Sequence, residues 1–595
     1  MRNENHNAPV SQKGSGRSFL ITDWLPVSAD EIRKRGWDEL DIIIVSGDAY
    51  IDHPAFGAAV IGRVLEAQGY KVAILPQPNW RDDLRDFRKL GKPRLFFGVT
   101  SGAMDSMVNH YTAQKRLRHD DAYTAGGAYG FRPDYAATVY TRILKQIYPD
   151  TPVVLGGIEA SLRRITHYDY WSDTLKPSIL VESGADYLVY GMGEYPIIEL
   201  ARYIERQSIA QGQNTRTTQE LLDIPQIAYI ESTQDAIAGE DDILLASHEE
   251  CLNDKRIQAQ NFAKFETASN KIHAPRLLQK TGSKTVVINP PRVPVPQDID
   301  IAFDLPYTRE PHPRYKKRGE IPAYKMIRNS VNTHRGCFGG CAFCTISAHQ
   351  GKQVQSRSEK SIINEIKQIA AQHDFKGILS DLGGPSANMY GMSGYKREMC
   401  EKCSKSSCIF PEVCSNLNVD YKPLVELYKK VTASPQIRKC FIGSGVRYDM
   451  LVQYLKTDNA AREYAELLID KATSGRLKVA PEHTEDHVLK LMRKSSFGFF
   501  EDFKKFFDSR VKGTKQLIPY FIASHPGCTM QDMRALTKRT RAMGYRLEQV
   551  QNFTPTPLTL ATEMYYTGLN PYTMEKVYVP RSKEERASQI DELLG

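Results

Sequence analysis

The chain has 595 residues, of which 41% are hydrophobic and 25% are charged, and its net charge is +9. These values are typical of a soluble globular protein, and no apolar run approaches the ~18 residues that a membrane span needs, which argues against a membrane protein. The polar N-terminus lacks the apolar middle of a secretory signal, so we expect a cytoplasmic protein of several domains that could accept an anionic partner such as RNA.

The first part of the chain alternates strand and helix signals. Residues 1–17 are predicted to be a disordered tail, and residues 56–70 and 135–150 have helical spacing. The predicted strands are the apolar runs at 41–48, 71–75, 94–100, 151–157 and 185–194. This alternation indicates an open parallel sheet over residues 18–205, with ligands expected at the carboxyl ends of its strands.

Residues 206–320 lose this alternation. A polar stretch at 236–266 contains one plausible helix, and the segment VVINPPRVPVPQ (286–297) is too rich in proline for a central strand. We therefore predict an irregular insert followed by an extended proline-rich linker.

The strand–helix alternation resumes at about residue 321. Helical spacing is found at 358–372, 423–434 and 461–472. Strand candidates lie at 324–337, 375–388, 437–446, 476–484, 514–527 and 548–557. Strands separated by helices in this way indicate a full or partial (β/α) barrel over 321–575, and residues 576–595 are predicted to be a C-terminal helix or tail.

Three cysteines, Cys337, Cys341 and Cys344, lie directly after a predicted strand in the glycine-rich stretch CFGGCAFC. A structural zinc site normally takes four protein ligands, whereas each iron of a cubic iron–sulfur cluster needs only one thiolate. The spacing therefore favours a [4Fe–4S] cluster with one iron left open. A zinc site that uses His334 or His349 as the fourth ligand is the alternative.

This C-x3-C-x-aromatic-C loop after the first strand of a (β/α) barrel resembles the signature of radical S-adenosylmethionine (SAM) enzymes. The resemblance implies that the three cysteines bind [4Fe–4S] and that the open iron chelates the methionine moiety of SAM. It also implies reductive cleavage to methionine and a 5′-deoxyadenosyl radical, with an electron donor such as flavodoxin or ferredoxin.

Later segments are similar to the family in the same order. Gly383 and Gly384 match its Gly-Gly-Glu stretch, with Pro385 in place of the acidic residue, and GSGVRYD makes Ser444 and Arg447 candidates for the cofactor pocket. Phe343 is a further candidate, as the aromatic residue beside the last cysteine. A fourth-strand segment is similar to that of methylthiotransferase-like members, but PEHT replaces Pro-Gln-Ser-Gly, so Glu482 is the weakest catalytic candidate.

In the N-terminal domain, the segments VVLGGIEASL (153–162) and ADYLVYGMGEYP (185–196) are similar to a cobalamin-binding domain. With DAYIDHPAFGAAVIGRVLE (48–66), NTHRGCFGGCAFC (332–344) and a cysteine-rich insert, the whole arrangement looks most like the YgiQ-like radical SAM family, whose substrate is not established. The motif Asp-x-His-x-x-Gly is absent because Asp52 and His53 are adjacent, so axial ligation of cobalamin by a histidine is not predicted. Cobalamin bound without such a ligand and an empty fold both remain open.

A second set of four cysteines, Cys400, Cys403, Cys408 and Cys414, lies in an insert at 395–418. Such a short polar loop cannot bury a core of its own, so zinc or a second iron–sulfur cluster would supply its cross-links. Four free cysteines are the alternative.

We expect a radical SAM enzyme with a [4Fe–4S] cluster, SAM as cofactor and an unidentified substrate, which RNA, protein or a small metabolite could supply. Methyl or methylthio transfer to RNA or protein is the alternative reaction. A further alternative is a non-catalytic metal-binding protein that contacts nucleic acid through the basic segment 314–330.

Overall fold

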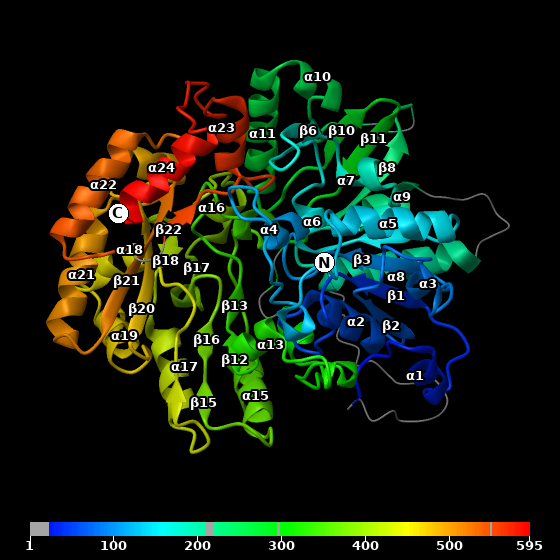
Figure 1. The fold of residues 1–595 in the computed structure, drawn as a ribbon, viewed down its shortest axis with the longest axis horizontal. Coiled ribbons are helices and arrows are strands. Elements are labelled where there is room, and N and C mark those ends of the chain that lie inside the picture. The colour runs from blue at the N-terminus through cyan, green and yellow to red at the C-terminus, as the bar shows by residue number, and fades with distance from the viewer. Residues whose placement is uncertain are drawn as a thin grey trace, which may run out of the picture.

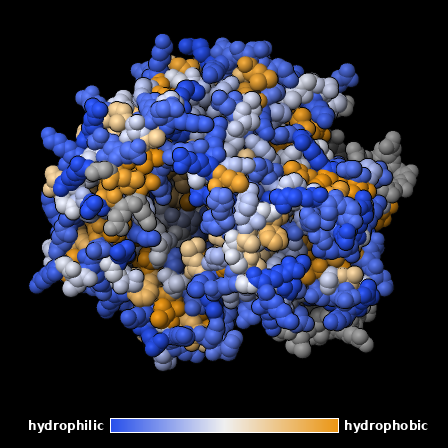
Figure 2. Space-filling model, in the orientation of Figure 1, coloured by the Kyte–Doolittle hydropathy of each residue, from blue (hydrophilic) through white to orange (hydrophobic). Residues whose placement is uncertain are grey.

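The computed structural model describes residues 23–209, 218–234, 236, 238–293, 295, 298–547 and 550–594 (Figure 1). The tail predicted over residues 1–17 lies outside these residues. Figure 1 shows the N-terminal sheet with its helices on one side of the molecule and the elements after residue 321 on the other. Figure 2 shows a hollow near the middle of this face, where the two parts meet. Within the described part of the chain, no helix has the length and apolar character to cross a membrane.

The N-terminal sheet has nine strands in the order β2-β1-β3-β4-β7-β8-β11-β10-β9. Its first five strands are parallel, and the pairing becomes antiparallel between β7 and β8. The parallel strands are β1 (Ile42–Ser46), β2 (Val72–Pro76), β3 (Phe96–Thr100), β4 (Val153–Leu155) and β7 (Tyr187–Val189). They confirm the predicted parallel sheet in this region.

Helices cover both faces of the sheet, because successive residues of its strands are buried on opposite sides. Ile42 and Ile44 pack in one core with α2 (Gly57–Ala67) and α8 (Glu194–Ile209). Ile43 and Val45 pack in a second core with α5 (Ala136–Ile147) and α7 (Ile179–Ser183). Burial on both faces explains why these strands are continuous apolar runs. The shorter elements of this part are α1 (Ala29–Lys34), α3 (Arg85–Arg88), α4 (Ser106–His110), η1 (Ala125–Gly127), α6 (Gly157–Ser161), β5 (His167–Asp169) and β6 (Thr174–Lys176).

The sheet does not end near residue 205, as predicted from the sequence, but continues through residue 288. The added strands are β8 (Ile227–Ser232), β9 (Ile243–Leu244), β10 (Leu277–Thr281) and β11 (Lys284–Ile288). β11 pairs with both β8 and β10 and overlaps the predicted linker at 286–297, because the prolines begin only after Ile288. The helical elements of this region are α9 (Thr218–Leu222), α10 (His248–Asn253), α11 (Lys255–Ser269), α12 (Asp300–Phe303) and η2 (Pro313–Tyr315).

The second part contains short parallel strands separated by helices. β12 (Ser330–Asn332) pairs with β16 (Asp381–Gly383), and β15 (Ile378–Leu379) pairs with β19 (Lys439–Cys440). β20 (Arg476–Glu482), β21 (Gln516–Ala523) and β22 (Val550–Asn552) form a parallel sheet of their own. The remaining strands are β13 (His334–Arg335), β14 (Gln355–Ser356), β17 (Ser393–Gly394) and β18 (Leu417–Asn418). Parallel strand pairs are what the sequence predicted here, and the strands described form several hydrogen-bonded sheets.

Amphipathic helices cover the outside of these strands. For example, α17 (Lys422–Thr432) and α19 (Asn459–Asp470) bury leucine, valine and tyrosine side chains at helical spacing and leave lysines and glutamates exposed. The other helices are α13 (Pro322–Ile327), α14 (Ile346–Gln350), α15 (Glu359–Ala370), η3 (Ala387–Met389), α16 (Arg397–Glu401), α18 (Tyr448–Tyr454), α20 (Asp486–Met492), α21 (Gly498–Val511), α22 (Met530–Ala542), α23 (Leu560–Thr567) and α24 (Lys583–Leu594).

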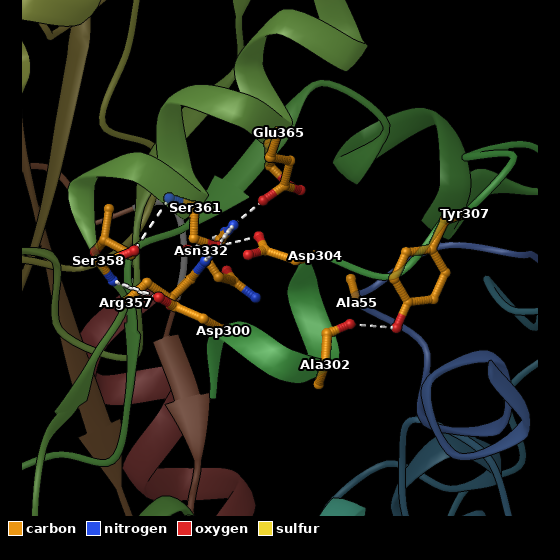
Figure 3. Close-up of polar contacts among 12 residues, drawn as sticks. Ala55, Asp300, Ala302, Asp304, Tyr307, Asn332, Arg357, Ser358, Ser361 and Glu365 are labelled. Carbon is orange, nitrogen blue, oxygen red and sulfur yellow. Dashed lines mark hydrogen bonds and ion pairs between the residues drawn. The ribbon is translucent and has the colours of Figure 1, made fainter. Parts of the chain in front are cut away.

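The short helix α12 fastens the start of α15 (Figure 3). The Asp300 carboxylate accepts the Ser358 N–H at 3.0 Å, and the Ser361 hydroxyl donates to Asp304 Oδ1 at 2.6 Å. Both serines lie at the N-terminus of α15, where backbone N–H groups lack partners within the helix. α12 therefore holds α15, and with it the strand β12, beside the N-terminal part.

Glu365 of α15 lies at the centre of a buried ion-pair network between the two parts. It accepts hydrogen bonds from Arg357 and, at 2.6 Å, from Arg309. Figure 3 shows Arg357 reaching both Glu365 and Asn332 of β12. Arg309 also contacts His53 Nε2 at 2.8 Å, which connects the network to the N-terminal part. Such a network fixes the position of β12, which leads directly into the cysteine loop.

Candidate metal and cofactor site

The three cysteines lie in a tight loop between β13 and α14. A Cβ at Gly336 would lie 2.2 Å from the carbonyl oxygen of Gln353, and one at Gly340 would lie 2.2 Å from that of Ser406. Both glycines also have positive φ angles of 81° and 57°. Only glycine fits these positions, which explains the glycine directly before Cys337 and the one directly before Cys341.

Two of the thiols have defined hydrogen-bond partners. The Gly339 N–H donates to Cys337 Sγ at 3.3 Å, and Cys337 Sγ lies 3.4 Å from the Ser386 hydroxyl. Arg447 Nη1 donates to Cys341 Sγ at 3.3 Å. Burial raises the pKa of Cys337, and the positive charge of Arg447 opposes that rise. A cation beside sulfur favours the thiolate form that metals bind.

Arg447 is held in place by Asp449. Its Nε and Nη2 atoms donate to the two carboxylate oxygens of Asp449 at 2.9 and 2.6 Å. Burial opposes ionisation of Asp449, but the Arg447 charge outweighs it and holds the pKa of this carboxyl well below its usual range. The bidentate pair leaves the Nη1 atom of Arg447 free to reach the cysteine loop.

The predicted cofactor residues Gly383, Gly384 and Ser444 lie beside this loop, at the carboxyl ends of β16 and β19. A Cβ at Gly383 would lie 2.0 Å from the Ser444 hydroxyl oxygen, and one at Gly384 would lie 2.5 Å from the His334 ring. Asp381 Oδ1 accepts hydrogen bonds from the Ser444 hydroxyl and N–H at 3.0 and 3.2 Å. Asp381 is a site residue that the sequence reasoning missed; its only signal was its position two residues before the glycine pair.

Phe343 and Glu482 lie at the edge of this arrangement. Phe343 contacts the ring of His525 edge-on, with 6.1 Å between the ring centroids. Glu482 is buried with a φ of 68°, and its carboxylate lies 3.7 Å from Lys494 Nζ. Burial raises the pKa of Cys344 to about 12, and the charge of Glu482 contributes to that rise. A buried non-glycine residue with positive φ is strained, and such strain is found most often at functional sites.

The second cysteine set packs directly onto the cysteine loop. β17 and β18 close the insert at its base, and the Cys408 N–H donates to the Phe338 carbonyl at 3.0 Å. Burial raises the pKa of Cys408 to about 11; Lys352 opposes this rise, whereas Cys403, Cys414 and Cys400 add to it. Within the described ranges, no group of three or more His, Cys, Asp or Glu side chains is arranged around a single ion, and this includes the three loop cysteines with His334 or His349.

A cavity of about 500 Å³ separates the N-terminal sheet from the cysteine loop. Its lining includes Gly156 and Gly193, which follow the carboxyl ends of the parallel strands β4 and β7, together with His334 and Gly384 from the other part. Ligand sites of open α/β sheets lie at this edge.

Asp52 and His53 are not available to a ligand in this cavity. Asp52 is fully buried and accepts hydrogen bonds from Arg63 at 3.0 and 2.6 Å, and His53 Nε2 faces Arg309 at 2.8 Å. This agrees with the sequence, which did not predict His53 as an axial ligand of cobalamin.

Comparison with known families defines the class of the chain. Residues 24–330 match the family model described as radical SAM N-terminal, and residues 548–591 match a domain of unknown function, DUF3362. The first match covers more than half of the chain and includes the strands β8–β11. The protein is therefore of the radical SAM class.

The chain belongs to the UPF0313 family, which confirms the predicted YgiQ-like radical SAM relationship. It is 58% identical to a UPF0313 protein from Bacteroides thetaiotaomicron, over 96% of this chain and 94% of that protein. It is 45% identical to one from Methanocella arvoryzae, over 94% of this chain and 91% of that protein.

Solved structures of radical SAM enzymes are similar at a lower level. The methyltransferase TsrM from Kitasatospora setae, with cobalamin and a [4Fe–4S] cluster bound, gives a TM-score of 0.47 at 16% identity, covering 87% of this chain and 74% of that one. The cobalamin-dependent enzyme OxsB, with aqua-cobalamin and SAM bound, gives a TM-score of 0.46 at 11% identity, covering 90% and 56%.

Proposed function

We propose that this protein is a radical SAM enzyme that cleaves SAM reductively and uses the resulting radical to modify a substrate. The observation that carries the proposal is the meeting of Cys337 and Cys341 with Arg447 and Ser386, which come from three separate segments. Three thiols with two hydrogen-bond donors beside them form a donor set for an iron–sulfur cluster rather than for a hydrophobic core.

The donor set fits a [4Fe–4S] cluster held by Cys337, Cys341 and Cys344. When bound, such a cluster would supply the electron that cleaves SAM, through an iron that has no protein ligand. The chain's own part is to hold three thiolates in one loop, to place the Arg447 cation beside them, and to bury the arrangement in part. Burial limits water access and strengthens each of these electrostatic contacts.

The residues proposed to hold SAM are Phe343, Gly383, Gly384, Ser444 and Arg447. Two of them supply backbone without side chains, at positions where a Cβ would collide with Ser444 or His334. Asp381 orients Ser444 by accepting both its N–H and its hydroxyl proton. Such a wall exposes peptide groups and a hydroxyl that could meet the amino and carboxylate groups of SAM, and Phe343 offers an apolar ring.

The insert is proposed to hold zinc or a second iron–sulfur cluster on Cys400, Cys403, Cys408 and Cys414. It lies against the cysteine loop, where the Cys408 N–H donates to Phe338. A reduced flavodoxin or ferredoxin is the proposed electron donor.

The test is anaerobic reconstitution with iron and sulfide, followed by dithionite and SAM. We expect 5′-deoxyadenosine and methionine from the wild type and from Cys440→Ala, which removes an isolated buried cysteine. Cys337→Ala, Cys341→Ala and Cys344→Ala should each abolish both products. Equal product from these variants and the wild type, or no product from wild type that carries a four-iron cluster, would contradict the proposal and favour the non-catalytic alternative. Methyl or methylthio transfer needs an RNA or protein acceptor in the assay, and would give S-adenosylhomocysteine together with the methylated or methylthiolated acceptor.

A further inference from the structure

The cavity between the sheet and the cysteine loop has features of a second ligand site, and its existence does not depend on the proposed function. Its volume of about 500 Å³ is within the range of small-molecule sites. None of the three loop cysteines lines the cavity. The wall on that side includes His334, Arg335, Gly384 and Pro385. A ligand in the cavity would therefore be separated from the three thiols by this wall.

His334 presents a ring nitrogen without a partner at this cavity. Its side chain is 1% exposed, and its Nε2 atom has no hydrogen-bond partner. Thr333 Oγ1 lies 2.9 Å from His334 Nδ1 and 3.1 Å from the Gly383 carbonyl oxygen, which also accepts the Thr333 N–H at 2.7 Å. Thr333 therefore engages Nδ1, and Nε2 is the ring nitrogen left for a ligand, as acceptor or donor according to the tautomer. A buried polar atom without a partner is costly unless a ligand or water supplies one.

His349 of α14 is held in the same way on the adjacent wall. The Ser161 hydroxyl donates its proton to the Gly157 carbonyl at 2.8 Å, and His349 Nδ1 lies 3.1 Å from Ser161 Oγ. Ser161 therefore engages Nδ1 of His349, and Nε2 is the ring nitrogen left for a ligand. Burial, together with the nearby Arg164 and Arg335, lowers the pKa of His349 to about 4. The side chain is neutral at physiological pH.

Most of the remaining lining is apolar. It includes Ile44, Phe56, Ile61, Val154 and Val189 from the sheet and its helices. The N-terminus of α2 also faces the cavity, where Phe56 occupies the N-cap position and provides no side-chain hydrogen bond to the helix. Glu194 and Arg335 also line the cavity, and their charges are paired with each other. An apolar body with a few polar anchors is the usual composition of an organic ligand's site.

We propose that this cavity binds a largely apolar organic molecule that forms hydrogen bonds with the Nε2 atoms of His334 and His349. The site lies against Gly384, so the bound molecule would share a wall with the proposed SAM site. A folded RNA or protein segment is not the occupant we propose, because the space is that of a small molecule.

Gly156 offers a way to fill the cavity without disturbing its walls. Its backbone is extended, with φ −155° and ψ 178°, and a Cβ there would meet only the Val189 carbonyl oxygen, at 3.8 Å. Gly156→Phe should therefore place a ring in the cavity, whereas Gly156→Ala leaves most of the volume open. Gly498→Phe, on α21, is a distant control with similarly open surroundings.

The probe is 8-anilinonaphthalene-1-sulfonate, which has two apolar ring systems, one N–H donor and one sulfonate acceptor. Fluorescence titration of the folded, metal-free full chain should show saturable binding of one dye per chain. We expect Gly156→Phe to weaken this binding at least tenfold, and Gly156→Ala and Gly498→Phe to change it less than twofold. Thermal melts within a few degrees of wild type would show that each variant is folded.

The role of the two ring nitrogens is tested with His334→Phe and His349→Phe, which keep an aromatic ring and remove Nε2. Each should weaken dye binding about fivefold, consistent with the loss of one hydrogen bond to the dye's N–H or sulfonate. Wild-type affinity in Gly156→Phe, or no saturable binding to wild type, would overturn the proposal of a ligand site. Wild-type affinity in both histidine variants would overturn the assignment of the two ring nitrogens. None of these measurements requires a cluster or SAM, so their failure is distinct from failure of the proposed function.

Discussion

The substitution Arg447→Gln tests the cation that lies between Asp449 and the cysteine loop. It removes two hydrogen bonds to the Asp449 carboxylate, at 2.9 and 2.6 Å, and one to Cys341 Sγ at 3.3 Å. Asp449 is only 3% exposed, so its charge would be left buried without its partner. Loss of one member of a buried ion pair costs about 3–5 kcal/mol. We therefore expect the free energy of unfolding to fall by about that amount.

A double variant separates the stabilising role of Arg447 from its proposed role at the cluster. Adding Asp449→Asn removes the uncompensated charge, so most of the lost stability should return. The double variant still lacks the N–H donor to Cys341 Sγ. A hydrogen bond to a charged group contributes about 1.5–3 kcal/mol, so SAM cleavage should remain roughly 10- to 100-fold below wild type.

Urea denaturation of the metal-free protein measures the first effect, and 5′-deoxyadenosine formation by the reconstituted protein measures the second. Arg462→Gln is the matched control, because Arg462 pairs with Glu466 at the surface of α19 and such pairs contribute under about 1 kcal/mol. Wild-type stability of Arg447→Gln would refute the ion-pair argument. Wild-type SAM cleavage by the double variant would show that Arg447 affects cleavage only by stabilising the fold.

Three further predictions use other parts of the molecule. Glu365→Gln should lower the free energy of unfolding by about 3–5 kcal/mol because it leaves two buried arginines uncompensated. Glu359→Gln, at a more exposed position of the same helix, is the control and should change the free energy of unfolding by under about 1 kcal/mol. Urea denaturation measures both. Burial raises the pKa of Glu563 to about 7, although a hydrogen bond from Gln258 opposes the rise. The raised pKa means that the folded protein binds this proton more tightly than the unfolded chain does. The free energy of unfolding should therefore fall by on the order of 3 kcal/mol as pH rises from about 4.5 to 7. Thermal melts across that range should show that Glu563→Gln removes this dependence. Cys408→Ala should lower the metal content of the chain in elemental analysis while Cys440→Ala leaves it unchanged, and equal metal in both would count against a metal in the insert.

Unbroken runs of apolar residues made the parallel strands predictable from the sequence. The antiparallel strands have shorter apolar runs and were not predicted. Ile42–Val45 is an unbroken apolar run because both faces of the central sheet are covered. β10 and β11 are also buried on both faces, but their apolar residues are limited to Leu277–Leu278 and Val286–Ile288. Gln279, Lys280 and Lys284 lie between these short runs, so the segment resembles a polar insert. The prolines at 290–291 then obscured a strand that ends two residues earlier.

The candidate site was predictable where it depends on side-chain type and spacing, and not where it depends on contacts between distant segments. Cys337, Cys341 and Cys344 were found because three thiols in eight residues are unusual. Asp381 was missed because a lone acidic residue in a strand gives no signal; its role follows only from the 3.0 Å contact to Ser444, 63 residues away. Arg447 was found by family resemblance, but its contact with Cys341 could not be inferred from spacing.

The shape of the cysteine loop depends on three distant segments that contact its backbone rather than its side chains. The Cys408 N–H donates to Phe338 O at 3.0 Å, the Ala342 N–H donates to Met492 O at 2.9 Å, and the Ala561 N–H donates to Ala342 O at 2.9 Å. Because metal binding to a small loop is coupled to its folding, a metal in the insert would order the segment that carries the Cys408 donor. The two cysteine sets are then linked mechanically: loss of metal from the insert should loosen the loop at Phe338, between Cys337 and Cys341, without any change in those thiols.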